Sequence, residues 1–202
     1  EGINLPFFPI DKVKEVLLEK FPDKTPIINQ FPDLILFTIS DEQINIAIQS
    51  NSVVITNSSA EEVTSEKVTI LGSIVKKICD LEDSSISAYG INIALDVTLE
   101  NRNSQVLNEA FNNTWLISTG LLNSDSLLSS SFKIREQYDT DSLVEITMEP
   151  RPTRTGDPTN KIVAQINRHW TTDSLPAISH IKNSFIGIRD AFYIKLENID
   201  QE

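Results

Sequence analysis

Side chains that both donate and accept hydrogen bonds recur at alternate positions of several extended segments. Amides stand at Asn45 and Gln49 in one segment and at Gln165 and Asn167 in another. An alternation of period two places such residues on one face of a β-strand. Amides suit the recognition of polar groups because they offer both donors and an acceptor. The site predicted from this pattern comprises Asn45, Gln49, Asn92, Asp96, Lys133, Arg135, Gln165, Asn167 and His169.

This polar face has two interpretations. An antiparallel sheet that packs on one side leaves its other side to water, and such a solvated face needs no function. The alternative is a concave binding surface, which the small number of lysines and glutamates in the pattern favours. The sequence therefore predicts where a binding surface would lie and leaves its use open.

A second candidate site lies in the segment 150–160. This segment is a long connection between two predicted strands, and it contains several prolines. Arg151 and Arg154 stand within it. Guanidinium groups on a protruding hairpin arm can bind phosphate or carboxylate groups through paired hydrogen bonds. Alternatively, these arginines pair with carboxylates of their own chain, and surface pairs of that kind are individually weak.

The sequence contains no motif of an established catalytic chemistry. His169 and His180 fall on different predicted elements, so no metal site is expected. Neither a glycine-rich phosphate loop nor a Gly-x-Ser-x-Gly segment occurs. Glu145 and Glu149 would lie about 13 Å apart along one strand, too far for the carboxylate pair of a glycosidase. Cys79 lies among apolar residues of a predicted helix, where a structural thiol is expected. We therefore expect no cofactor.

Composition narrows the classes of partner. The formal net charge is −12 and the sequence pI is about 4.6, which disfavours binding to nucleic acid and to anionic membranes. Hydrophobic residues make up 40% of the chain, enough for a sizeable core. No apolar run approaches the roughly 18 residues of a membrane span. These features predict a protein of the cytoplasm without membrane association.

Hydrophobic periodicity predicts the elements that position these residues. In the first half we expect a strand, a helix, three strands and a helix, at 3–8, 11–21, 34–39, 44–49, 53–56 and from 65 onward. The second half repeats this order at 91–99, 104–111, 132–138, 143–149, 161–170 and 178–199.

The last helix carries an unbroken apolar stripe with spacings of three and four residues. A stripe of this kind indicates a helix that packs on a sheet, although a coiled-coil seam is the alternative. Its members are Ile178, Ile181, Phe185, Ile188 and Phe192.

The repeated order predicts an α+β fold made of two halves, 1–83 and 84–202, which form one compact unit. Duplicated strand-helix-three-strand-helix units would join edge to edge into a curved antiparallel sheet with helices on one face.

Two short motifs accompany this order. Phe21-Pro22 ends the first helix, and Tyr89-Gly90-Ile91-Asn92 opens the mid-chain strand. In these motifs and in its element order, the chain resembles a sporadically distributed bacterial family of uncharacterised duplicated α+β proteins. The arrangement is also similar to the saddle of TATA-box-binding-like folds. The resemblance covers most of the chain in element order; it implies the duplicated sheet and brings no activity with it.

The function that best fits the sequence is that of a non-enzymatic binding or interaction module. It would contact a protein or a small polar ligand through the polar sheet face or the 150–160 arm. One alternative is an enzyme of an unrecognised type with a carboxylate and His169 in a deep pocket. A nucleic-acid-associated protein is the third, by analogy with the saddle fold. The oligomeric state stays open, a homodimer included.

Overall fold

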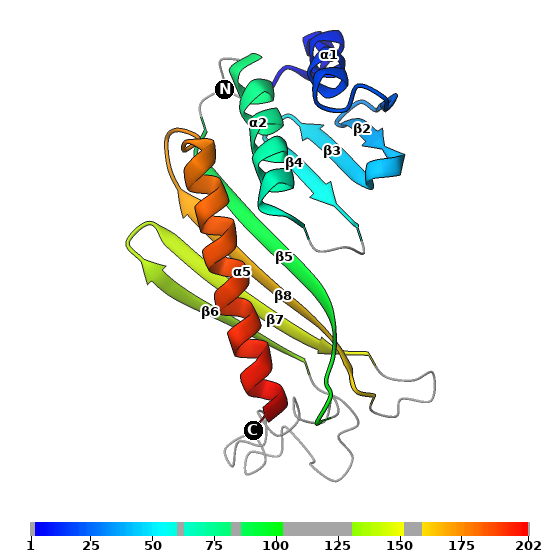
Figure 1. The fold of residues 1–202 in the computed structure, drawn as a ribbon. Helices are drawn as coiled ribbons and strands as arrows, with labels where there is room; N and C mark the ends of the chain where they lie inside the picture. The colour runs from blue at the N-terminus through cyan, green and yellow to red at the C-terminus, as the bar shows by residue number, and fades with distance from the viewer. Residues whose placement is uncertain (1–2, 60–62, 82–85, 103–130, 152–158, 202) are drawn as a thin grey trace. The chain divides into compact units, whose positions relative to one another are not determined.

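The structure is a computed structural model that describes residues 3–59, 63–81, 86–102, 131–151 and 159–201. These residues form α-helices and two antiparallel four-stranded sheets, which confirms the predicted α+β class (Figure 1). The chain divides into two compact units. Unit 1 contains Glu1–Ser87 and Asp173–Ile186, and unit 2 contains Ala88–Thr172 and Gly187–Glu202. The first part of the last helix therefore belongs to unit 1, whereas the sequence placed the whole helix with the second half.

Unit 1 holds the first sheet, in which consecutive strands lie side by side in the order β1-β2-β3-β4. Its strands are β1 (Ile27–Gln30), β2 (Ile35–Ile39), β3 (Ile44–Gln49) and β4 (Ser52–Asn57), and its complete helices are α1 (Ile10–Lys20) and α2 (Ser65–Leu81). All but β1 were predicted from the sequence.

The core of unit 1 follows from the alternation in its central strands. β2 and β3 bury every second residue, and Phe37 pairs with Ile46, both with 0% exposure. Val13 of α1 and Ile78 of α2 are completely buried in the same apolar cluster. Burial of one strand face and one stripe of each helix thus holds these elements together.

The strand predicted at 3–8 is wrong, because residues Leu5–Phe7 form a short 3₁₀ helix. Pro6 lies at its start, and Pro9 follows two residues after its end. Proline has no N–H and fixes its own φ angle, so two prolines this close prevent a strand ladder and suit a helical turn.

In unit 2 the strands lie in the order β5-β8-β7-β6. The predicted strands are confirmed with small changes at their ends: β5 (Ala88–Thr98), β6 (Phe132–Asp139), β7 (Ser142–Pro150) and β8 (Lys161–Thr171). The helix expected at 104–111 lies outside the described residues. The last helix, α5 (Ile178–Gln201), is confirmed over the predicted range.

One face of the second sheet carries buried apolar side chains at its centre. Ile162 and Ala164 of β8 have 0% exposure, and β7 adds Met148. In Figure 1, the part of α5 that belongs to unit 2, from Gly187 onward, runs across one face of this sheet, and its residue Phe192 is also completely buried. The apolar stripe of α5 is therefore core rather than the seam of an exposed coiled coil.

The beginning of α5 packs within unit 1, on α2. Gly72 of α2 is buried, and a Cβ atom at this position would lie 3.6 Å from Cγ2 of Ile178 and 3.9 Å from Cδ1 of Ile181. These distances are ordinary van der Waals contacts, so the first turn of α5 packs directly on α2 at Gly72.

The described residues form two sheets, where the sequence predicted one curved sheet. Among the described residues, no strand of the first sheet pairs with a strand of the second. The strand orders also differ, since β5 pairs with β8 whereas β1 pairs with β2. Duplication of one unit stays a prediction from the element order.

Candidate functional site

The face of the second sheet opposite its buried core carries polar side chains from all four strands. Pairing of the strands in register brings together residues from all four strands on this face. Each of them is exposed or half-buried. We call this set the polar face: Asn92, Asp96, Lys133, Arg135, Glu145, Thr147, Gln165, Asn167 and His169.

One row of the polar face crosses the whole sheet. Asn92 of β5 lies opposite Asn167 of β8, which lies opposite Glu145 of β7, and Glu145 lies opposite Arg135 of β6. The sequence predicted all but Glu145 of these as site residues, and strand pairing brings them together. The row presents two adjacent amides beside an ion pair, so it can donate and accept hydrogen bonds at neighbouring points.

Glu145 is the centre of the charged half of the polar face. Its carboxylate lies 2.6 Å from Nζ of Lys133 and 2.8 Å from a terminal nitrogen of Arg135. Hydrogen bonds from Lys133 and then from Arg135 hold the pKa of Glu145 below its ordinary value of 4.5. The two cations share one carboxylate, so this part of the face keeps a positive excess in an otherwise acidic chain.

Acid is expected to weaken unit 2 through protonation of Glu145. Because the folded pKa is lowered, the stabilisation is fully present above the ordinary value of 4.5 and is lost as the pH falls through the folded pKa. Urea unfolding of the wild type and of Glu145→Gln, measured at several values between about pH 6 and pH 3, checks this. The free energy of unfolding should fall less steeply in the variant, and equal slopes would contradict the assignment.

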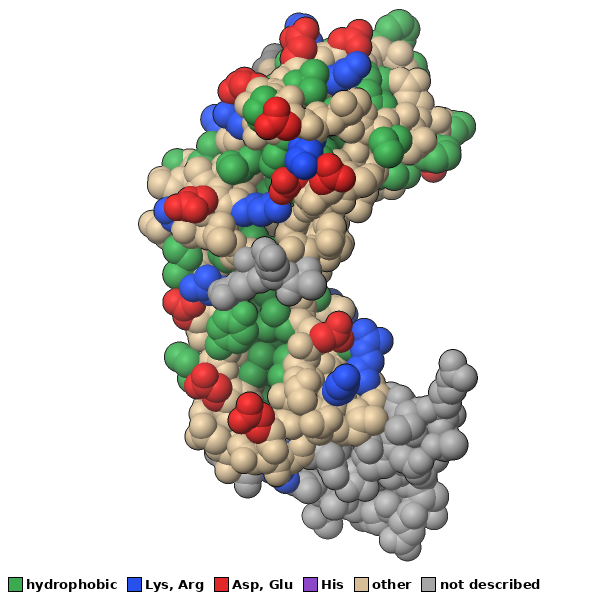
Figure 2. Space-filling view, turned by 45° about the vertical axis from the view of Figure 1, so that its right-hand side comes forward, with side chains coloured by type: hydrophobic (Ala, Val, Ile, Leu, Met, Phe, Trp, Pro, Cys, Tyr) green, Lys and Arg blue, Asp and Glu red, His purple; other side chains and the backbone are tan. Residues whose placement is uncertain are grey.

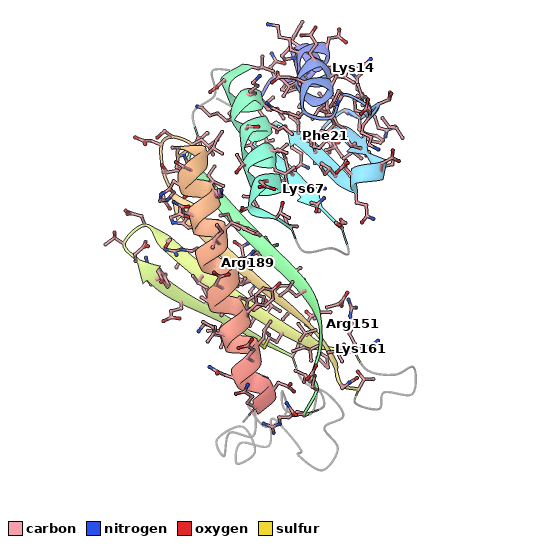
Figure 3. The ribbon with its side chains drawn as sticks, viewed as in Figure 1. Lys14, Phe21, Lys67, Arg151, Lys161 and Arg189 are labelled. Atoms are coloured by element: carbon pink, nitrogen blue, oxygen red, sulfur yellow. The ribbon has the colours of Figure 1, made fainter. Side chains whose placement is uncertain are left out.

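At the other end of the polar face, Asp96 pairs with Arg151 at a distance of 3.4 Å. Arg151 and Lys161 lie where β7 and β8 meet the connection between them (Figure 3). The backbone N–H of Arg151 donates to the carbonyl of Lys161 at 2.9 Å. Arg151 is thus held by its own chain at the base of the arm. Arg154 lies outside the described residues.

Two predicted site residues belong elsewhere. Asn45 and Gln49 lie on β3, on the open face of the first sheet, and not in the sheet that contains the polar face. Asn45 accepts a hydrogen bond from the hydroxyl of Thr38 at 2.9 Å. The sequence placed them with the others because it predicted one continuous sheet, and no pairing between the two sheets occurs among the residues that the structure describes.

His169 is exposed on the polar face beside Gly90 of the neighbouring strand. A Cβ atom at Gly90 would lie 3.3 Å from the carbonyl oxygen of Arg168 and 3.6 Å from Nδ1 of His169. Glycine therefore leaves the strand backbone uncovered between the imidazole and the side chain of Asn167. This is a place where another backbone can approach the sheet closely.

On the buried side, four side chains at one end of the sheet form a stack that sequence reasoning missed. The guanidinium carbon of Arg168 lies 4.0 Å from the ring centroid of Tyr138 and 4.8 Å from that of Trp170. Trp170 in turn stacks on Tyr89, with a centroid distance of 4.6 Å and an interplanar angle of 3°. We call these residues the arginine stack: Tyr138, Arg168, Trp170 and Tyr89.

Hydrogen bonds fix the arginine stack in place. Arg168 lies 2.8 Å from a carboxylate oxygen of Asp139 and donates to the hydroxyl of Ser142 at 3.2 Å. The pKa of Asp139 is lowered, first by the hydroxyl of Ser142 and then by the backbone N–H of Asp141. The alternation Arg168-His169-Trp170 was visible in the sequence, but its partners lie on other strands. Because its groups satisfy one another, we assign the arginine stack a structural role.

Chemistry beyond binding finds little support in the described part of the chain. Within it, no group of three or more His, Cys, Asp or Glu side chains could hold a metal ion. Cys79 is half-buried, and burial raises the pKa of its thiol, so it is protonated at neutral pH. A cavity of about 340 Å³ in unit 1 has no ionisable lining residue; it is lined by Leu5, Pro6, Phe8, Ile10, Gln30, Phe31, Pro32 and Ile35.

The distribution of surface charge and the composition of the helices bear on which partners the chain can bind. Figure 2 shows acidic and basic side chains mixed on the surfaces drawn for each unit, without a continuous basic patch. None of the described helices is both long and apolar enough to cross a membrane.

Comparison with known proteins gives no match: no protein-family model, no curated protein and no solved structure is similar to this chain.

Proposed function

We propose that the chain is a non-enzymatic interaction module and that the polar face of unit 2 contacts a protein partner. The observation that carries this proposal is the row that crosses all four strands, with the amides of Asn92 and Asn167 exposed or half-buried beside an ion pair. No hydrogen bond found among the described residues involves the side chain of either amide. Such groups are available to a partner's backbone and polar side chains.

A protein partner fits the polar face better than a small ligand does. Small molecules bind in concave, largely apolar sites, and the cavity described above has no lining residue on the polar face. The charges on this face also nearly balance, since Lys133 and Arg135 face Glu145, and Arg151 faces Asp96. A partner therefore needs no strong charge of its own, and shape and hydrogen bonding would decide specificity.

The test is affinity purification from the native host with the wild type and with a variant of the polar face. In Asn92→Ala/Asn167→Ala both central amides are removed without a change of charge. We expect a protein that copurifies with the wild type, identified by native mass spectrometry, to be lost from this variant. The matched control is Asn45→Ala/Gln49→Ala, which removes two amides from the first sheet and should retain the partner.

The outcomes separate the alternatives. Equal capture by both variants would place the interaction elsewhere and contradict the proposal. A bound small molecule in place of a protein would favour the small polar ligand instead. The resemblance to the duplicated bacterial α+β family and to the saddle folds remains compatible with an interaction role and adds no residue to the site.

A further inference from the structure

The outer edge of β1 in unit 1 presents unpaired backbone groups. β1 is the terminal strand of the first sheet, and none of the described strands pairs with its outer side. The N–H of Phe31 donates to the carbonyl of Leu34 at 2.8 Å, so Phe31 faces β2. Backbone groups alternate in direction along an antiparallel strand, so Asn29 also faces β2, whereas Ile28 and Gln30 turn their N–H and C=O groups outward.

β1 is short and lies between two prolines, but its edge lacks the charged side chains that commonly prevent strands from associating. Ile27 is 55% exposed and Phe31 is 53% exposed, and both lie on the open face of the first sheet. The segment 25–32 contains no charged residue, although the whole chain has a net charge of −12. Charged side chains are a common protection of edge strands, and their absence leaves an exposed apolar edge.

The sequence of this edge has a symmetric pattern about Asn29. One residue away on either side stand Ile28 and Gln30, whose backbone groups point outward. Two residues away stand the exposed apolar side chains of Ile27 and Phe31. Three residues away stand two prolines, Pro26 and Pro32. Positions equally distant from a centre are those that face each other when two identical strands pair antiparallel.

We propose that the partner of this edge is a second copy of the chain, whose β1 pairs antiparallel with a two-fold axis at Asn29. Ile28 of each copy then faces Gln30 of the other, so all the outward backbone groups of both residues find partners. Each Ile27 faces the Phe31 of the other copy, which covers the exposed apolar side chains. Each Pro26 faces a Pro32, and the hydrogen-bonded ladder ends there because proline has no N–H.

The cavity in unit 1 lies next to the same edge. Gln30, Phe31 and Pro32 are among the residues that line it. The proposed register puts Ile28 of the other copy opposite Gln30 and its Pro26 opposite Pro32. Ile28 and Pro26 of the second copy would thus lie beside residues that line this cavity. A segment of unrelated sequence would fulfil these pairings only by chance, which is why a second copy is the favoured occupant.

One pair of short strands buries less surface than a standard protein interface, so the dimer should be weak and dependent on concentration. Sedimentation velocity of the full chain from roughly 5 to 500 µM measures the equilibrium. In Asn29→Asp and in Asn29→Lys, two like charges would face each other across the two-fold axis, and each variant alone should dimerise at least about tenfold more weakly. An equal mixture of the two variants should recover the dimer, because opposite charges then meet.

Thr56 provides the matched controls. It is an exposed residue of β4, at the opposite edge of the first sheet, and it lies on the same open face as Asn29. Thr56→Asp and Thr56→Lys should dimerise like the wild type, alone and mixed. Circular dichroism establishes that every variant is folded. A wild type that stays monomeric over the whole range overturns the proposal. So does a dimer that is insensitive to both Asn29 variants, or a mixture of folded variants that fails to associate.

Discussion

Phe192→Ala is expected to lower the free energy of unfolding of unit 2 by about 3–5 kcal/mol. Phe192 lies on α5 and has 0% exposure. Its replacement removes the transfer free energy of a large apolar side chain and leaves a cavity between a helix and a sheet. Urea unfolding followed by tryptophan fluorescence measures the loss, because both tryptophans of the chain, Trp115 and Trp170, fall within the residue range of unit 2.

Ile194→Ala is the matched control, since Ile194 lies on the same helix and is 58% exposed. This change should stay within about 0.5 kcal/mol of the wild type. A similar effect of both substitutions would mean that α5 does not bury its apolar stripe on the sheet.

The second large effect is expected for Arg168→Ala, with a loss of about 2–4 kcal/mol in the same measurement. The side chain of Arg168 is only 18% exposed, and it combines an ion pair with Asp139, hydrogen bonds to Ser142 and contact with two aromatic rings. Its removal leaves the carboxylate of Asp139 without its cation and leaves the ring of Trp170 in contact with Tyr89 only on one side.

Arg168→Lys distinguishes the contributions of charge and stacking. Lysine keeps the positive charge, but it has no planar group to lie between Tyr138 and Trp170. We expect this variant to lose roughly half as much stability as Arg168→Ala, since cation–π contact with a flat guanidinium is the part that lysine replaces poorly. If Arg168→Ala unfolds like the wild type, the arginine stack has no structural role.

The second sheet shows which features a sequence can predict. The polar and apolar residues of β5 and β8 alternate, and this local pattern identified both strands and the side of each that faces water. The hairpins β6–β7 and β7–β8 then set the register between consecutive strands. For this reason Asn167 and Arg135 were correctly placed on one face before the structure was known.

The remaining features depend on contacts between distant residues. β1 is only 4 residues long and lies between prolines, so its periodicity was too short to recognise. Tyr138 joins the arginine stack next to an irregularity in the register between Gln137 and Asp139, which no local pattern encodes. Asn45 was assigned to the wrong sheet because the number of sheets depends on which outer strands pair.

The division of α5 between the units bears on how the protein is made. The ribosome adds residues in order, so all of 88–172 is synthesised before 173–186, the segment that completes unit 1. Ile178, which lies against the Gly72 position of α2, therefore becomes available only after residues 88–172 have been made. A nascent chain or a fragment that stops before α5 therefore lacks part of both units, and neither residues 1–87 nor residues 88–172 can be expressed as a complete unit.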